Sequence, residues 1–298
     1  MTEARTILAP AKVNLFLGVG ERRADGYHDV VTVLQTLELF DVLVLEPGRG
    51  LIVECEPDVG LPPCDNLAAV AARVLGGLCD REPQLSVHID KRIPVGGGLG
   101  GGSSDAAAVL LGLGDSWGLA PGDPRLDEAA RAVGADVPFF FTGGTALLRG
   151  RGDVLDRALP SRALDIVLVN PGAPASTAAA YAALDRVPRG PSPGPEVLID
   201  ALAVGLPAGI AAALHNDMTE ASVSLVPAIG EAVSWLGGQP GVFGACMAGS
   251  GSSVFGVTRD AGAALRAADA ARARGWWAVA TRSRGEGVVF ADAEATDR

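Results

Sequence analysis

The stretch from residue 94 to residue 110, PVGGGLGGGSSDAAAVL, combines the residue types that hold a phosphate group. Six of the seven residues from 96 to 102 are glycine. Glycine permits positive φ and close approach, so successive backbone amides can curve around an anion. A serine before the helix-forming run would cap a helix whose positive end faces the loop. The predicted nucleotide-phosphate contacts are Pro94, Gly96, Gly97, Gly98, Leu99, Gly100, Gly101, Gly102, Ser103 and Ser104, with Ser103 or Ser104 as the N-cap.

Two common phosphate loops do not fit this stretch. Its glycines satisfy the G-x-G-x-x-G spacing of dinucleotide-binding proteins, but a central parallel strand should precede that motif and be almost wholly apolar. The strand before this loop carries His88, Asp90, Lys91 and Arg92. No acidic residue ends a clean strand at the required interval after the loop, and no Gly-Lys-Ser/Thr follows as in a Walker A loop. The sequence therefore predicts a phosphate cradle of another type.

Asp105 conflicts with this prediction. A carboxylate in the first helical turn favours the helix dipole but repels a triphosphate. We therefore expect Asp105 to point away from the phosphates or to meet a cation. This favours a magnesium ion in the site.

The rarest polar residue types are a second source of candidates. Lys12 and Lys91 are the only lysines among 24 basic residues, so arginine serves wherever a general cation suffices. Lys12 is a candidate for a role that needs a compact ammonium, which the planar guanidinium cannot copy. Lys91, at the end of a strand, is expected to be a solvated charge. Tyr27 and Tyr181 are the only tyrosines.

Composition bounds the class of protein. The chain has 298 residues and a net charge of −11, which argues against nucleic-acid partners because phosphate backbones select basic surfaces. Cys55, Cys64, Cys79 and Cys246 lack CxxC spacing and are expected to be reduced thiols in a cytoplasmic protein. We expect no membrane partner, because the most apolar run, residues 201–214, is too short to span a bilayer.

The order of the expected elements indicates an α+β fold. Strand patterns fill the first third, over AKVNLFLGVG, VVTVLQTLELFDVLVLEP and LIVECEP, and a strand at LSVHID precedes the glycine loop. Helical patterns cover 65–78, 104–113, 124–133, 199–214 and 217–236, and FFFTGGTALLRG is strand-like. This order lacks a regular βαβ rhythm. Turn residues near 159–161 predict two domains, 1–160 and 161–298.

Four stretches resemble one superfamily when they are read together. PVGGGLGGGSSDAA is similar to the phosphate-binding motif of the GHMP kinases. APAKVNLFLGVGERRADGYHDV (9–30) and GADVPFF (134–140) resemble the branch of that superfamily that acts on a cytidine-diphosphate-linked polyol, and GACMAGSGSSVFGV resembles its C-terminal glycine motif. The resemblance spans essentially the whole chain, in the right order.

The resemblance implies a fold and an activity. The fold is an N-terminal ATP-binding lobe like domain 2 of ribosomal protein S5 and a C-terminal ferredoxin-like lobe, with substrate between them. The activity is ATP- and Mg²⁺-dependent phosphorylation of the 2-hydroxyl of CDP-methylerythritol in non-mevalonate isoprenoid synthesis. In the catalytic pair, Asp136 is the base toward the hydroxyl, and Lys12 orients that hydroxyl and stabilises developing charge.

The resemblance also implies the ligand contacts. Tyr27 stacks on cytosine, Tyr181 takes the second aromatic position, and His28 bonds the base edge. Asn66 lies near adenine, where simple helix capping is an equally good interpretation. Ala248 stands where the family often has Ser or Thr. Further expected substrate contacts are Asn14, Thr177, Gly249, Ser250 and Gly251.

Two rival functions stay open from sequence alone. One is a GHMP kinase for a different alcohol, which would not need the aromatic pair. The other is a non-catalytic nucleotide-binding relative, against which the presence of both Lys12 and Asp136 argues. We expect a small-molecule substrate and a monomer or weak homodimer.

Overall fold

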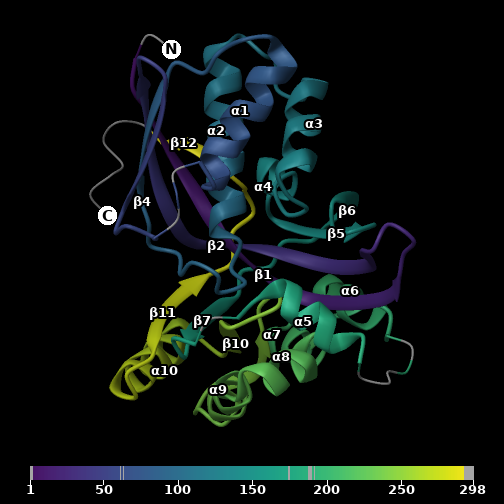
Figure 1. Cartoon of the computed structure of the whole chain (residues 1–298). Helices are drawn as coiled ribbons and strands as arrows, with labels where there is room; N and C mark the ends of the chain where they lie inside the picture. The colour runs from purple at the N-terminus through teal and green to yellow at the C-terminus, as the bar shows by residue number, and fades with distance from the viewer. Residues whose placement is uncertain are drawn as a thin grey trace.

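The fold is described from a computed structural model, which describes residues 3–60, 62, 64–173, 175–186, 190 and 192–291. Its elements form two lobes, and the long β1–β2 hairpin runs between them (Figure 1). The strands are β1 (Arg5–Arg22), β2 (His28–Pro47), β3 (Leu51–Glu56), β4 (Leu85–Asp90), β5 (Thr145–Arg149), β6 (Val154–Leu159), β7 (Asp165–Asn170), β8 (His215–Asn216), β9 (Val242–Met247), β10 (Val254–Thr258), β11 (Trp277–Arg282) and β12 (Val289–Ala291). The helices are α1 (Leu67–Cys79), α2 (Gly101–Ser116), α3 (Pro124–Val133), α4 (Phe139–Thr142), α5 (Thr177–Leu184), α6 (Glu196–Val204), α7 (Pro207–Ala212), α8 (Thr219–Leu225), α9 (Pro227–Gly237) and α10 (Ala261–Ala273).

The first sheet is built on the antiparallel hairpin of β1 and β2. Its main order is β12-β1-β2-β4-β3, in which β3 and β4 are parallel and joined through α1. β2 has two partners on one edge: its first part pairs with β5 and its last part with β4. The sheet therefore divides at the middle of β2, and the glycine loop that follows β4 lies beside this division.

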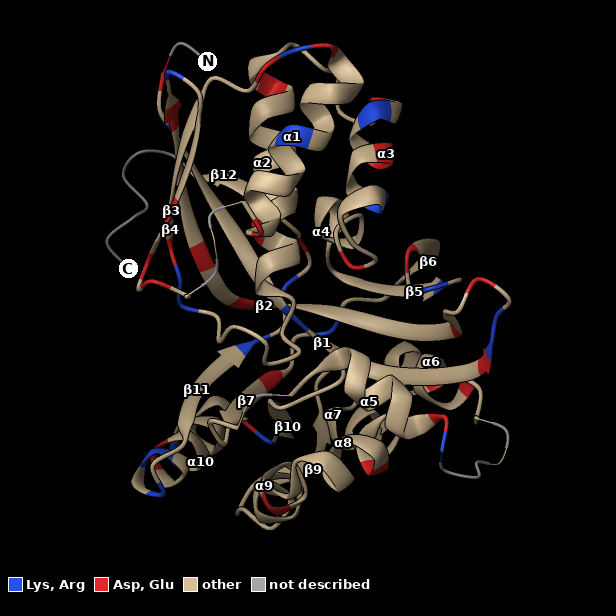
Figure 2. Ribbon diagram, viewed as in Figure 1, with Lys and Arg blue, Asp and Glu red and all other residues tan. Residues whose placement is uncertain are grey.

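Helices α1, α2 and α3 cover the first sheet, as the upper part of Figure 1 shows. Their small residues, including Ala68, Ala72 and Ala107, pack against Leu43 and Leu45 of β2 in one buried cluster. Alanine at these positions lets helices and sheet approach closely while apolar area is removed from water. Charges lie mostly on loops and outward faces, and α2 is almost free of them (Figure 2).

The second sheet has the order β11-β7-β10-β9 and is antiparallel throughout. With α9 after β7 and α10 after β10, its chain order is βαββαβ, which is the ferredoxin-like arrangement. α9 and α10 pack against it through Ile229, Leu236 and Ala268. This confirms the α+β class and the two expected lobe types.

The lobes share a core and exchange strands. Leu15 and Leu37 of the hairpin pack against Leu168 and Phe255 of the second sheet. The chain also returns to the first sheet twice after residue 160, as β8 and β12, both of which pair with β1. The expected boundary at 160/161 falls between β6 and β7, and as a domain boundary it stays a prediction.

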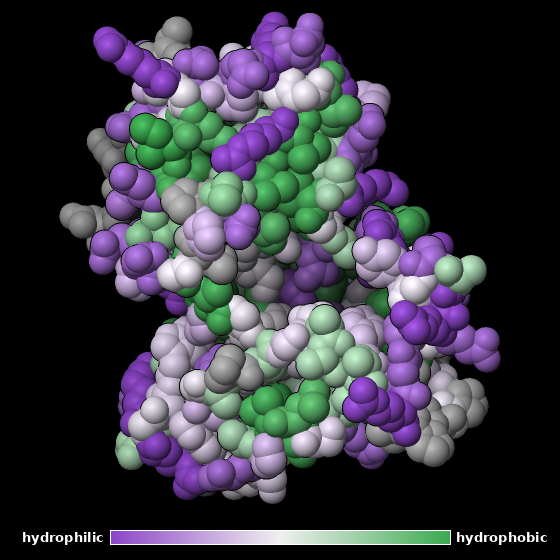
Figure 3. Space-filling view, viewed as in Figure 1, coloured by the Kyte–Doolittle hydropathy of each residue, from purple (hydrophilic) through white to green (hydrophobic). Residues whose placement is uncertain are grey.

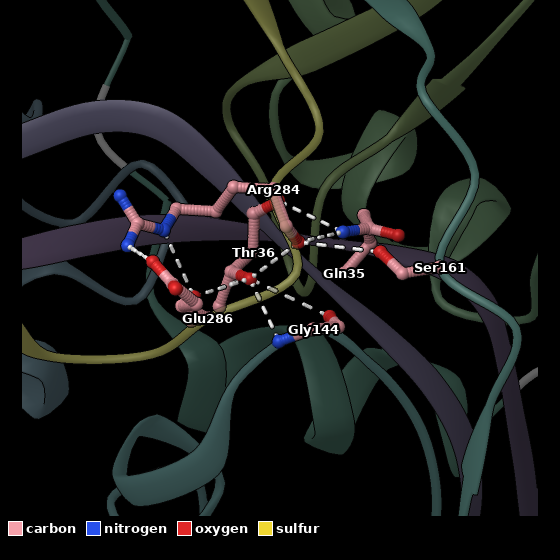
Figure 4. Close-up of polar contacts among 6 residues, drawn as sticks. All are labelled: Gln35, Thr36, Gly144, Ser161, Arg284 and Glu286. Carbon is pink, nitrogen blue, oxygen red and sulfur yellow. Dashed lines mark hydrogen bonds and ion pairs between the residues drawn. The ribbon is translucent and has the colours of Figure 1, made fainter.

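A polar network fixes the segment between β11 and β12 to the middle of β2. Thr36 Oγ1 accepts a hydrogen bond from Gly144 N and donates one to the Glu286 carbonyl, both at 2.9 Å. Gln35 Nε2 donates to the Arg284 carbonyl at 2.8 Å (Figure 4). These buried side chains satisfy backbone groups at the point where β2 changes partner, so the lobes are held together there.

Several sequence predictions of local structure were wrong in detail. FFFT forms α4, and only TALLR is a strand. The helix expected over 217–236 is two helices, because Pro227 cannot donate a hydrogen bond inside a helix and begins α9 instead. Pro207 likewise begins α7 and divides the helix expected over 199–214. By contrast, α3 spans the predicted 124–133.

Candidate active site

A cavity of about 1130 Å³ lies between the lobes, and the space-filling view shows a recess there (Figure 3). Its walls come from β1, the start of β2, the glycine loop, the start of α2, the α3–α4 turn, α5 and the loop after β9. Most predicted site residues line it: Lys12, Asn14, Tyr27, His28, Asn66, Pro94, Gly96, Gly97, Gly98, Leu99, Gly100, Gly101, Gly102, Ser103, Asp136, Thr177, Tyr181, Gly249 and Ser250. Ser104 and Gly251 are buried beside it and do not line it.

The glycine loop is shaped by two separate requirements. Gly96, Gly98 and Gly100 have φ of 68°, 78° and 75°, a backbone region that L side chains rarely adopt. At Gly98 an added Cβ would also overlap the Ala248 carbonyl, whereas at Gly96 nothing lies within 4 Å. The glycine loop therefore packs directly against the backbone of the C-terminal glycine motif at Gly98. Ser253 N donates to the Gly97 carbonyl at 3.0 Å and fixes this contact.

Helix α2 begins earlier than predicted. Gly100 in the left-handed region is its N-cap residue, and no side chain caps it, so the prediction of Ser103 or Ser104 as N-cap was wrong. The reason is that glycine enters the helix without steric cost and places both serines inside the first turn. Among the described residues, no acceptor bonds the amides of Gly101, Gly102 or Ser103. These N–H groups line the cavity at the positive end of α2, so they are suited to bind phosphate oxygens.

The two residues of the predicted catalytic pair lie side by side on the cavity wall. Lys12 Nζ lies 3.2 Å from Asp136 Oδ2 and donates to Asn14 Oδ1 at 2.9 Å. Lys12 is 4% exposed, whereas the Asp136 side chain is 31% exposed. A buried ammonium held between two oxygen acceptors has a fixed position, and the carboxylate beside it is accessible to a ligand.

Asn14 holds this arrangement rather than simply facing a ligand. Its Oδ1 also accepts from Gly249 N at 3.0 Å, and its Nδ2 donates to Thr32 Oγ1 at 2.9 Å. Lys12 and Asn14 lie between two register shifts of β1 against β2, at Pro10/Lys12 and at Asn14/Phe16. Such irregularities re-aim side chains near functional sites. One amide group thus joins the lysine, the second strand and the C-terminal glycine motif.

Asp105 meets a cation that the chain itself supplies. Lys91 Nζ lies 2.7 Å from Asp105 Oδ2 and 2.5 Å from Asp41 Oδ2. Burial raises the pKa of Asp105 to about 7, with Lys91 opposing the rise and Asp41 adding to it. The Lys91 side chain is 6% exposed, so the expectation of a solvated charge was wrong. Lys91 supplies the cation that the Asp105 carboxylate was expected to meet. Asp105 therefore no longer argues for Mg²⁺ in the site.

The predicted base-binding residues also line the cavity, and two of them are in contact. The His28 and Tyr181 rings stack, with centroids 5.1 Å apart, and Arg151 lies 4.9 Å from the centre of the Tyr27 ring. Tyr27 is 55% exposed, with the Arg151 guanidinium over its ring. Burial and then the charge of Asp136 raise the pKa of Tyr181.

The remaining predicted contacts have partners within the protein. Thr177 Oγ1 and Ser250 Oγ hydrogen-bond each other at 2.7 Å and join α5 to the C-terminal glycine motif. Asn66 caps α1 by accepting from Ala68 N at 2.9 Å, and it also lines the cavity. Both interpretations of Asn66, capping and ligand contact, are therefore compatible with its position.

Among the cavity-lining residues that sequence reasoning did not assign to the site are four polar ones, Thr32, Lys91, Arg151 and Asp185. Thr32 had a usable signal, a polar residue at a buried position of an apolar strand. Lys91 had one too, since it is one of only two lysines. Arg151 and Asp185 lie in turns, where a single charged residue is ordinarily solvated.

Three further expectations concern metals, cysteines and membranes. Within the described ranges, no group of three or more His, Cys, Asp or Glu side chains could hold a metal ion by itself. All four cysteines are free thiols. None of the helices described here combines the length and apolar character needed to cross a bilayer.

The fold and the site together define a GHMP kinase, a small-molecule kinase that uses ATP. The family models for the GHMP kinases N terminal domain and the GHMP kinases C terminal domain match residues 66–144 and 198–275. The chain is also similar to homoserine kinase from Cytophaga hutchinsonii, with a TM-score of 0.73 at 18% identity over 98% of each chain, which shows the shared fold.

Closer relatives define the branch. The chain is 40% identical over 288 residues to 4-diphosphocytidyl-2-C-methyl-D-erythritol kinase of Rhizorhabdus wittichii, covering 94% of each protein. It is 40% identical over 287 residues to that of Geobacter sulfurreducens, covering 93% of this chain and 98% of the relative. A crystal structure of 4-(cytidine 5'-diphospho)-2C-methyl-D-erythritol kinase matches with a TM-score of 0.77 at 36% identity, over 95% of this chain and all of the other. The chain belongs to the 4-diphosphocytidyl-2-C-methyl-D-erythritol kinase family.

Proposed function

We propose that the chain transfers the γ-phosphoryl group of ATP to the 2-hydroxyl of 4-(cytidine 5'-diphospho)-2-C-methyl-D-erythritol in non-mevalonate isoprenoid synthesis. The observation that carries this proposal is the pairing of Lys12 with Asp136 at 3.2 Å in one cavity with the glycine loop. Phosphoryl transfer needs a positioned hydroxyl, a group to take its proton, and positive charge near the moving phosphoryl group. The cavity wall offers each of these.

The chain's own residues act as follows. Asp136 accepts the proton of the substrate hydroxyl as the oxygen attacks the γ-phosphorus and the bond to ADP breaks. Lys12 orients that oxygen and balances the charge that develops on the transferring group. Asn14 keeps the ammonium in place, and the free amides of Gly101, Gly102 and Ser103 hold the phosphates of ATP.

The residues present are compatible with Mg²⁺ only as an ion that arrives with ATP. Mg²⁺ is commonly held by one or two protein oxygen ligands together with substrate phosphates and water. Ser103 and Asp136 offer such oxygens on the cavity wall. When bound, the ion would neutralise phosphate charge.

The base end of the cavity supports a pyrimidine nucleotide as the carrier of the alcohol. Tyr27 offers an exposed ring for stacking, His28 offers a ring nitrogen to the base edge, and Tyr181 supports the histidine ring. A cavity of about 1130 Å³ can hold two ligands of nucleotide size. We further propose a cytoplasmic enzyme with no nucleic-acid or membrane partner, monomeric or weakly dimeric.

A substrate panel tests the proposed function. The protein is incubated with Mg-ATP and, separately, with CDP-methylerythritol, mevalonate, homoserine or galactose, and phosphate transfer is followed by ³¹P NMR. We expect a phosphomonoester on the 2-hydroxyl of CDP-methylerythritol only. Phosphorylation of another alcohol in its place would identify a different GHMP kinase, and transfer to none would indicate a non-catalytic relative.

The role of Asp136 has its own test. Asp136→Asn keeps the shape but removes the base, so we expect kcat to fall by about 100-fold or more while ATP still binds. Glu128→Gln on α3 is a matched control, because it removes one acidic charge outside the cavity lining. Unchanged turnover in Asp136→Asn would remove the base assignment.

A further inference from the structure

We propose that Asp185 is a positioning residue that fixes the proton of His28 on Nε2, and that the pair thereby selects cytosine over uracil. The inference rests on the proposed function, because it concerns which base the substrate carries. It goes further by naming the residue that sets base selectivity and the chemical reason for it.

The geometry of the pair is well defined. His28 Nε2 lies 2.7 Å from Asp185 Oδ1, at the end of α5, 157 positions away in sequence. His28 is 6% exposed, and its ring stacks on Tyr181 with an angle of 23° between the planes. The ring is thus held at one edge by a carboxylate and on one face by an aromatic ring. All three residues line the cavity.

The carboxylate decides which ring nitrogen carries the proton. A neutral imidazole has one N–H donor and one acceptor nitrogen, and a carboxylate can only accept. The proton must therefore lie on Nε2, where it is donated to Asp185, so Nδ1 becomes the acceptor. Among the residues that the structure describes, no group bonds Nδ1. The nitrogen that is left over is an acceptor available to a ligand in the cavity.

An acceptor nitrogen distinguishes the two common pyrimidines. Cytosine carries an amino group at position 4 and presents a donor there, whereas uracil carries a carbonyl and presents an acceptor. Nδ1 can accept a hydrogen bond from the cytosine amine. Against uracil, the lone pair of Nδ1 would meet a lone pair of the carbonyl oxygen, and the two would repel. A site built to pair with an N–H rejects the analogue that lacks it, because a buried polar group is then left unpaired. Removing Asp185 frees the imidazole to take the other tautomer, which could donate to uracil.

The chain supplies a control within its own three histidines. His215 Nε2 lies 2.6 Å from Asp217 Oδ1, the same kind of pair, and neither residue lines the cavity. His88 is exposed on β4. Side-chain ¹⁵N spectra should therefore show two histidines protonated on Nε2 and one solvated histidine. Asp185→Ala should change only one of the paired signals and so assign it to His28.

Kinetics test the functional half of the proposal. Asp185→Ala, Asp185→Asn and Asp29→Ala are compared for kcat and KM with CDP- and UDP-methylerythritol at about pH 8, where an ordinary imidazole is neutral. We expect Asp185→Ala to lower the CDP/UDP ratio of kcat/KM about tenfold, mainly through KM for the CDP substrate. Asp185→Asn, whose amide oxygen can still accept from Nε2, should retain most of the ratio. Asp29→Ala, which removes a neighbouring exposed charge, should leave the ratio unchanged.

The outcomes separate this inference from the proposed function. An unchanged CDP/UDP ratio in Asp185→Ala, or a wild-type His28 signal protonated on Nδ1 or on both nitrogens, overturns the role of Asp185. A wild-type protein that phosphorylates neither substrate overturns the proposed function instead. In that case the ¹⁵N spectra of wild type and Asp185→Ala still decide whether Asp185 fixes the proton.

Discussion

Gly98→Ala tests the contact between the two glycine motifs that shapes the phosphate site. Gly98 and Gly96 both have positive φ, at 78° and 68°, so alanine at either position carries the same backbone penalty of about 1–2 kcal/mol. They differ in their surroundings. A Cβ at Gly98 would overlap the Ala248 carbonyl oxygen and lie 3.0 Å from its carbon, whereas a Cβ at Gly96 has no neighbour within 4 Å.

The expected difference follows from this geometry. The overlapping atoms belong to backbone, so relief requires the two loops to separate, and such overpacking typically costs a further 1–3 kcal/mol, roughly. Gly98→Ala should therefore lower the free energy of unfolding by about 1–3 kcal/mol more than Gly96→Ala. Urea unfolding at equilibrium, followed by circular dichroism, measures both values, provided that the two variants have equal m-values.

Equal destabilisation of the two variants would refute the reasoning, because it would mean that only φ matters and that the loops are not in contact in solution. A kinetic measurement provides an independent check. Separation of the loops moves Gly249 away from Asn14, so Gly98→Ala should also lower kcat, whereas a change in KM for ATP alone would show that the contact does not reach the catalytic pair.

Three further predictions concern the site. Asn14→Ala should lower kcat about tenfold or more, with little change in KM for ATP, because Lys12 loses the acceptor that fixes it; steady-state kinetics would contradict this if only KM changed. Tyr27→Ala should raise KM for CDP-methylerythritol about 5- to 100-fold through loss of stacking, and an unchanged KM would favour a cytidine-free substrate. Asp105 has a pKa raised to about 7 in the folded protein, so its contribution to stability is complete below its unfolded pKa near 3.8 and is lost as pH rises through about 7. The stability of wild type relative to Asp105→Asn should therefore fall between about pH 4 and pH 7, and urea unfolding that shows a constant difference would contradict the burial of this carboxyl group.

The sequence predicted the parts of the site that local chemistry determines. The glycine loop was predictable because six glycines at the start of a helix have few structural uses other than close backbone approach. Lys12 stood out because it is one of only two lysines in a chain whose other basic residues are arginines. The roles of Asp136, Tyr27 and His28 came from resemblance, since an isolated aspartate, tyrosine or histidine is ordinarily a surface or core residue.

The parts that sequence missed depend on contacts between distant segments. The start of α2 at Gly101 follows from the left-handed conformation of Gly100, which is packed against Lys12 and Phe140. The pairing of Lys91 with Asp41 and Asp105 joins a strand end, a second strand and a helix, and no local pattern encodes it. Asp185 meets His28 across 157 positions of sequence. The return of β8 and β12 to the first sheet is of the same kind, because two- and three-residue strands have no usable periodicity.

The most direct test of the site assignment is a crystal structure of the protein with a non-hydrolysable ATP analogue, Mg²⁺ and CDP-methylerythritol. We predict triphosphate oxygens on the amides of Gly101, Gly102 and Ser103, and the 2-hydroxyl within hydrogen-bonding distance of both Lys12 Nζ and Asp136. Triphosphate bound away from the start of α2, or a 2-hydroxyl out of reach of Asp136, would contradict the account.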